Sequence, residues 1–151
     1  MKVTLDHNCV IDLADQTSIG EQIRRVVVNP RYQCFVVDIG ASEAWERGVR
    51  ADRYDKFEEL LANAGIAHLP RLLPMMMWDI CFWDHGIWSD DAMIKLSKEI
   101  EAILFGTALP GAPSAGLDSA EGKKWLNRVC DATTLWCHVY YKNDVFMTSD
   151  R

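Results

Sequence analysis

The sequence predicts an α/β fold in which a mainly parallel sheet lies between helices. Two observations lead to this prediction: short apolar runs of strand length recur along the chain, and amphipathic helical segments separate them. The runs are continuous rather than alternating, which is typical of parallel strands covered on both faces. A length of 151 residues is typical of one domain, so we expect residues 1–151 to form a single domain.

The first third of the chain supplies two strands and a helix. A β-branched, apolar run over residues 3–5 ends at Asp6 and predicts the first strand. A helix over 18–28 is indicated by a Ser-x-x-Glu capping box at its start and an Asn-Pro pair after its end. The run 34–37 then predicts the second strand.

The next part of the chain is expected to contain two helices and a short strand. A serine can cap a brief helix over 42–46, and apolar residues at helical spacing predict a longer helix over 53–63. Residues 66–73 are apolar enough for a third strand. Pro70 places that strand at an edge of the sheet, because proline has no amide hydrogen to donate.

The last part of the chain predicts two helices and a closing strand. Asp90 or Asp91 caps the first of these helices. Repeated Gly, Pro, Ala and Ser over 106–122 indicate a loop, a helix follows over 123–142, and a strand follows over 145–148.

The charge of the chain argues against one class of function. The net charge is −6, from 16 Lys and Arg against 22 Asp and Glu. A protein that binds nucleic acid through a general basic surface needs clustered Lys and Arg, which this composition does not favour. Any bound polyanion would therefore need a local basic patch or a bridging cation.

The cysteines indicate the compartment. The chain has five cysteines, scattered and mostly within apolar runs, and no Cys-x-x-Cys pair. This pattern is typical of buried free thiols rather than of a disulfide framework or a zinc site. No apolar run approaches the length of a membrane span. We therefore expect a cytoplasmic protein.

Four acids stand where a functional site is expected. Asp6 and Asp150 directly follow strand runs, and ligands of open α/β sheets bind at the carboxyl ends of strands. Asp131 lies on the last helix, away from its apolar face, and Glu46 on an earlier helix is a fourth candidate. An acid after a strand is more often a turn or cap residue, so the combination carries the argument. Converging carboxylates need a cation, and Mg²⁺ or Mn²⁺ suits oxygen ligands.

Two motifs at opposite ends of the chain resemble those of the PIN-domain ribonucleases. The first is the opening strand with its Asp-x-Asn at Asp6 and Asn8. The second is a helix Asp at 131, a turn, an apolar strand and then Thr-x-Asp at Thr148 and Asp150. The order of strands and helices between them agrees, so the resemblance covers nearly the whole chain.

The resemblance implies a three-layer Rossmann-like fold and a Mg²⁺- or Mn²⁺-dependent endoribonuclease with an acidic pocket. The metal-binding acids of the family match Asp6, Asp131 and Asp150, and its supporting polar positions match Asn8 and Thr148. The middle catalytic acid fits Glu46, with Glu43 one helical turn earlier on the same face. Many family members are toxins, so RNA as substrate, a small antitoxin protein and a homodimer are the expected partners.

The chain departs from the family pattern in two places. Its middle section, residues 71–122, is longer than compact members need. It also ends at Arg151, where the family continues, so we expect either a smaller sheet or a truncated chain. Arg151 adjoins a proposed ligand and is the candidate for contacting the phosphate of the substrate.

The segment 75–88 is dense in methionine and aromatic residues. Met and aromatic side chains fill cores, so the favoured interpretation is additional core for the longer middle section. The alternative is a base-stacking platform or a docking surface for a partner. Asp79 and Asp84 within it are expected to be turn residues.

Two other functions remain open. A non-catalytic PIN-fold module would act through the segment 75–88 and a partner. A phosphatase of the haloacid dehalogenase type would use Asp6 as its nucleophile, but Asn8 stands where that class has a second Asp. A metal response would separate the nuclease from the binding module, and the preferred substrate would separate it from the phosphatase.

Overall fold

The computed structural model describes residues 1–39 and 42–150. For Ser42 and Glu43 it describes the backbone but not the side chains. Helices and strands alternate along much of the chain. The elements in chain order are β1 (Lys2–Leu5), α1 (His7–Ala14), α2 (Ser18–Val27), β2 (Gln33–Val37), the 3₁₀ helix η1 (Ser42–Arg47), α3 (Tyr54–Asn63), β3 (Arg71–Leu72), α4 (Asp91–Phe105), α5 (Ala120–Tyr140) and β4 (Val145–Met147).

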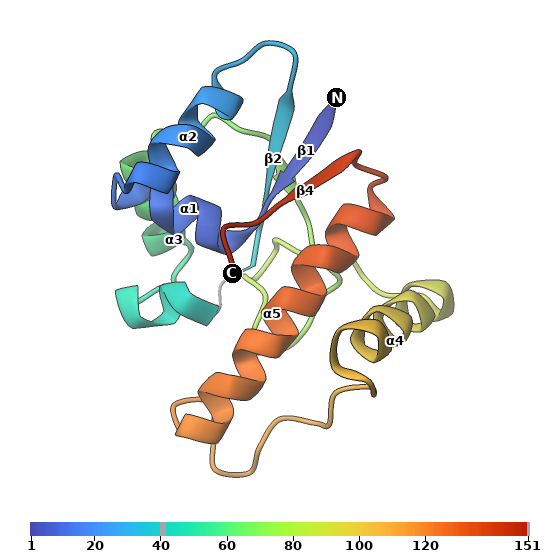
Figure 1. Ribbon diagram of the computed structural model, residues 1–151. Coiled ribbons are helices and arrows are strands. Elements are labelled where there is room, and N and C mark those ends of the chain that lie inside the picture. The colour runs from blue at the N-terminus through green and yellow to red at the C-terminus, as the bar shows by residue number, and fades with distance from the viewer. Residues whose placement is uncertain (40–41, 151) are drawn as a thin grey trace.

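The strands described form a four-stranded sheet in the order β3-β2-β1-β4, and all of its pairings are parallel. Helices α1, α2 and α3 cover one side of this sheet, and α4 and α5 lie on the other side (Figure 1). The predicted α/β class with helices on both faces of a parallel sheet is therefore confirmed. Each helical layer encloses its own apolar cluster, with Phe57 and Leu61 on one side and Leu126 and Trp136 on the other.

Several element boundaries differ from the prediction. The helix predicted from residue 18 does begin there, but its cap is Thr17, whose hydroxyl accepts the amide of Gly20 at 3.0 Å. The strand expected over 66–73 is only two residues long, because the chain turns before Pro70. The helix expected over 42–46 is a 3₁₀ helix, η1.

Two further boundaries concern the starts of the last two helices. Asp90, one of the two predicted caps, begins α4 by accepting the amide of Met93 at 2.8 Å. The last helix starts earlier than expected, after Ser119. Among the described residues, no helix combines the length and apolar character of a membrane span.

Candidate functional site

The order of the sheet creates a crevice between β1 and β4. The chain moves from β1 outward to β2 and β3, and then returns through α5 to place β4 on the other side of β1. Ligands of such sheets bind where the strand order reverses, outside the carboxyl ends of the strands. Asp6 follows β1 and Asp150 lies three residues after β4, so the fold places both at this crevice.

Asp6 is held rigidly at the junction of β1 and α1. It caps α1, with Oδ1 accepting the backbone amide of His7 at 2.8 Å. Its second oxygen, Oδ2, accepts the hydroxyl of Thr148 at 2.8 Å. Asp6 is buried, with 7% of its surface exposed. A buried carboxylate with both oxygens bonded is fixed in one orientation, as a site residue must be.

Asp150 is brought to the same junction by contacts between the two ends of the chain. Asn8 on α1 donates its side-chain amide to Oδ1 of Asp150 at 2.5 Å. Thr148 accepts the backbone amide of Asp150 at 3.1 Å, so one threonine contacts both acids. The end of the chain therefore lies beside the start of α1 (Figure 1).

Asp131 lies across the crevice, exposed on α5 as the sequence predicts. It lines a cavity of about 230 Å³ together with both other aspartates. The residues around this cavity, which we call the acid pocket, come from the β1–α1 junction, α5 and the end of the chain: Asp6, His7, Asn8, Asn127, Cys130, Asp131, Thr134 and Asp150. The three acids predicted to bind metal therefore share one cavity.

Glu46 does not line the acid pocket. It lies on η1 and lines a neighbouring cavity of about 590 Å³, where its carboxylate is 3.6 Å from Nζ of Lys123. We call this the side cavity; its lining comes from α1, η1 and α5: Ile11, Trp45, Glu46, Arg47, Lys123, Leu126 and Asn127. Glu46 is thus paired with a cation beside the pocket rather than joined to the three aspartates.

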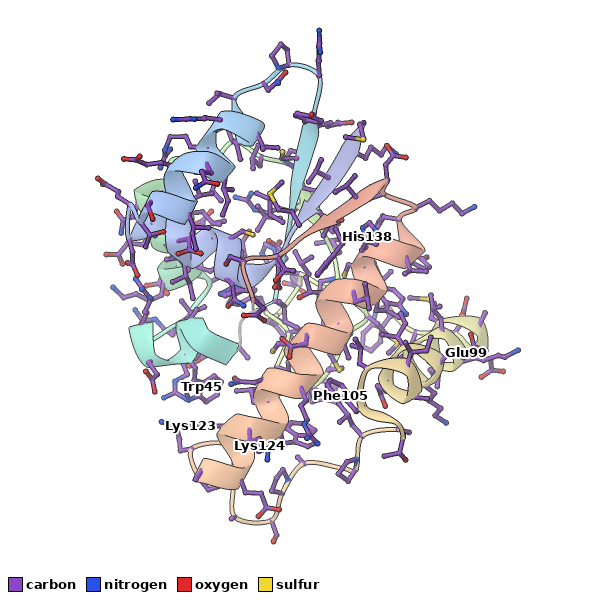
Figure 2. The ribbon with its side chains drawn as sticks, viewed as in Figure 1. Trp45, Glu99, Phe105, Lys123, Lys124 and His138 are labelled. Carbon is purple, nitrogen blue, oxygen red and sulfur yellow. The ribbon has the colours of Figure 1, made fainter. Side chains whose placement is uncertain are left out.

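A third cavity, of about 230 Å³, opens on the other side of the same acids. It shares Asp6, Asp131 and Asp150 with the acid pocket, and apolar side chains including Phe105 and Phe146 line the rest. Phe105 lies between α4 and α5, whereas Trp45 and Lys123 lie towards the start of α5 (Figure 2). The acid pocket therefore shares its three aspartates with a mainly apolar cavity and shares Asn127 with the side cavity.

The acid pocket contains two titratable groups that burial keeps neutral. Burial, followed by the charge of Arg47, lowers the pKa of His7 to about 4. Burial also raises the pKa of the Cys130 thiol, and the charges of Asp131, Cys81 and Asp6 act in the same direction. His7 and Cys130 therefore add no charge to the acid pocket near neutral pH.

Sequence reasoning missed two polar residues of α5 in the site and one buried acid outside it. Asn127 and Thr134 stand four residues before and three residues after Asp131, so helical spacing on its face would have indicated both. Asp38 after β2 is the third. It occupies a strand end like Asp6, but its carboxylate is buried against Tyr54 and His85 instead of lining the acid pocket.

The residues of the acid pocket fit a hard cation by their chemistry. The pocket offers carboxylate and amide oxygens from three chain segments, which is the donor set that Mg²⁺ and Mn²⁺ prefer. Within residues 1–39 and 42–150, however, no group of three or more His, Cys, Asp or Glu stands close enough together to hold a metal ion. The three aspartates share the cavity without forming a preassembled ligand set.

Two predicted site residues cannot be placed. The side chain of Glu43 and all of Arg151 lie outside the described residues.

Comparison with known proteins identifies no relative of this chain. No protein-family model, no curated protein and no solved structure matches this chain. The structural argument for a function therefore rests on the three aspartates that the sheet brings to one crevice.

Proposed function

We propose that this protein is a metal-dependent endoribonuclease of the PIN-domain type, hydrolysing phosphodiester bonds of RNA. The observation that carries the proposal is that Asp6, Asp131 and Asp150 line one cavity at the crevice of a parallel sheet. They come from a strand end, a helix and the end of the chain, so only the fold brings them together. These are also the acids that match the metal-binding positions of the family.

In this proposal the three aspartates hold Mg²⁺ or Mn²⁺. Bound there, the cation would lower the pKa of a water molecule and neutralise charge on the phosphate. Asp6 is fixed by two hydrogen bonds and Asp150 is held by the side chain of Asn8, while Asp131 and Asp150 both remain exposed to solvent.

The residues around the acids have separate tasks. Thr148 orients Asp6 and the backbone of Asp150, and Asn8 orients the Asp150 carboxylate. The side cavity supplies Lys123 for a phosphate, and Asn127 lines both cavities. A polynucleotide crossing the acids would thus meet two cationic side chains of the side cavity, Arg47 and Lys123, although the net charge is −6.

RNA cleavage with substituted acids tests the proposal. Wild type with Mn²⁺ should cut single-stranded or structured RNA, and Asp6→Asn and Asp150→Asn should reduce cleavage at least about 100-fold, since metal-holding carboxylates would be neutralised. Asp91→Asn, in the exposed first turn of α4, is the matched control and should keep full activity. Equal cleavage by wild type and both pocket variants would refute the assignment.

A metal titration separates the nuclease from the binding module. Calorimetry or thermal unfolding should show Mn²⁺ binding by wild type, and Asp6→Asn should weaken it. A folded wild type with no response to Mn²⁺ or Mg²⁺ would favour a non-catalytic module. Preferred turnover of a phosphomonoester over RNA would instead favour the phosphatase.

The partners and compartment are further parts of the proposal. An antitoxin protein and a homodimer are implied by the resemblance alone. A reducing cytoplasm is supported by the state of the cysteines, which are all free and buried.

A further inference from the structure

Three tryptophans of the middle section are exposed to solvent. Trp78 and Trp83 each expose 66% of their surface and Trp88 exposes 80%. The favoured interpretation of this segment as core is therefore wrong for these three residues, although Ile80 and Phe82 between them are buried. Clustered exposed tryptophans are uncommon on soluble proteins and typical of binding sites.

The backbone beneath these tryptophans is held in place. Met76 and Ile87 are joined by a backbone hydrogen bond of 2.9 Å. The backbone of Cys81 forms an isolated antiparallel β-bridge with Ile39, two residues after β2. His85 bonds to the buried Asp38 at 2.9 Å. A binding surface on a fixed backbone loses little conformational entropy when a ligand arrives.

The tryptophans and a carboxylate form a small pocket. Trp78 and Trp83 pack against each other with ring centroids 5.4 Å apart, tilted by 41°. With Trp88 and Asp84 they line a cavity of about 160 Å³. A second cavity beside it adds Asp79 and Asp52 to the same tryptophan pair. This tryptophan pocket shares no lining residue with the acid pocket.

The charge of the segment that carries the tryptophans selects the ligand. The 23 residues between Arg71 and Lys95 include four aspartates and no Lys or Arg. The loop that adds Asp52 also carries Arg50 and Arg53, which are paired with Asp118 and Asp55. Aromatic faces attract cations through the ring quadrupole, and neighbouring carboxylates add to this attraction. An anionic polynucleotide would be repelled by the same surface, which argues against a base-stacking platform.

The described residues contain an internal example of an arginine stacked on a tryptophan and paired with a carboxylate. The guanidinium of Arg50 lies 3.5 Å from the ring centroid of Trp45 and is paired with Asp118 at 3.1 Å. A planar guanidinium can stack on indole while its edge donates to a carboxylate, which an ammonium cannot do as well. The tryptophan pocket offers the same two partners, indole and carboxylate, at an exposed position.

We propose that Trp78, Trp83 and Trp88, with Asp84, bind an arginine side chain presented by a partner protein. The guanidinium stacks on the exposed indole faces and donates to the Asp84 carboxylate. The site is independent of the nuclease proposal, because it uses none of the acid-pocket residues.

Nuclear magnetic resonance of the tryptophan indole N–H groups tests this proposal with the full chain. The probe is the capped peptide acetyl-Gly-Arg-Gly-amide, titrated beside its citrulline counterpart, which keeps the shape but carries no charge. The arginine peptide should shift the signals of Trp78, Trp83 and Trp88 saturably, and the citrulline peptide should bind at least about threefold more weakly. The signal of Trp45, already covered by Arg50, should not move.

Two variants and one control connect the shifts to the pocket. Trp88→Ala and Asp84→Asn should each weaken binding about two- to fivefold. Asparagine tolerates the positive φ of 65° at residue 84, so the backbone should be kept. Asp91→Asn, outside both tryptophan cavities, should bind as wild type. Equal binding of the citrulline peptide, no saturable shift, or shifts produced by oligouridylate instead would overturn the proposal.

Discussion

At the scale of the residue, Thr148 is the polar group that joins the two strand-end acids. Its hydroxyl donates to Asp6 at 2.8 Å and accepts the amide of Asp150 at 3.1 Å. Sequence resemblance indicated this position, but only the structure shows that a single oxygen serves both neighbours.

Thr148→Val keeps the size of the side chain and removes both hydrogen bonds. Loss of such a supporting group should weaken Mn²⁺ affinity or RNA cleavage about 10- to 100-fold, because Asp6 loses its fixed orientation. Calorimetry and a cleavage assay measure the two effects. Thr107→Val, at an exposed loop position, should change neither. An unchanged metal affinity and cleavage rate in Thr148→Val would remove Thr148 from the site.

His138 on α5 predicts a pH dependence of stability. Its Nδ1 lies 3.1 Å from the hydroxyl of the buried Thr4. Burial lowers the pKa of His138 below its ordinary value of 6.5, although nearby Asp144 acts in the opposite direction. The unfolded chain therefore takes up a proton at a higher pH than the folded chain does.

The free energy of unfolding should accordingly fall as the pH drops below about 6.5, and it should continue to fall until the pH reaches the lower pKa that His138 has in the folded protein. Urea unfolding of wild type and His138→Gln between pH 7.5 and about 5 measures this, and the variant should show a shallower fall. His68→Gln, at an exposed position, is the control and should follow wild type. Parallel curves for wild type and His138→Gln would contradict the assignment.

At the scale of the element, the packing of α1 on α2 depends on Gly20. A Cβ atom added there would lie 2.1 Å from the carbonyl oxygen of Asp12 on α1, far closer than atoms approach. The two helices can therefore touch only because residue 20 has no side chain.

Gly20→Ala should lower the free energy of unfolding by about 1–3 kcal/mol, because α1 and α2 must move apart to make room for the added methyl group. The better helix propensity of alanine is worth only about 1 kcal/mol and does not reverse the sign. Urea unfolding measures the change. Gly111→Ala is the control, because nothing lies within 4 Å of an added Cβ there. Equal stability of the two variants would show that α1 and α2 adjust freely.

At the scale of the whole molecule, Asp38 ties the sheet to the long middle section. It follows β2 and is 1% exposed. Its carboxylate forms hydrogen bonds with the hydroxyl of Tyr54 at 3.3 Å and with the ring of His85 at 2.9 Å. Arg71 lies 3.4 Å away. Burial raises the pKa of Asp38, while its contacts with His85, Arg71 and Tyr54 act in the opposite direction. These partners offset the cost of burying the carboxylate.

Asp38→Ala should lower the free energy of unfolding by about 3 kcal/mol, because three polar partners lose their shared acceptor. Since His85 lies in the segment 75–88 with the exposed tryptophans, the fluorescence of these tryptophans should also change in Asp38→Ala. Asp55→Ala removes only an exposed pair with Arg53 and should cost less than about 1 kcal/mol. A similar loss in both variants would deny Asp38 its central role.

Much of the fold and the two strand-end acids of the site follow from local patterns. Continuous apolar runs predicted the strands, and caps and helical spacing predicted most helices, because these signals depend on neighbouring residues only. Asp6 and Asp150 could be placed at strand ends in the same way. The parallel order then required them to meet at one edge of the sheet.

The remaining features depend on contacts between segments far apart in the sequence. The sequence alone determined the α/β class, the succession of elements apart from α1, and the strand-end acids. Only the tertiary structure decided that Glu46 faces Lys123, that Asp38 is buried, and that three tryptophans are exposed. The reason is physical: a local pattern sets the conformation of a segment, whereas burial and partners depend on which other segments pack against it.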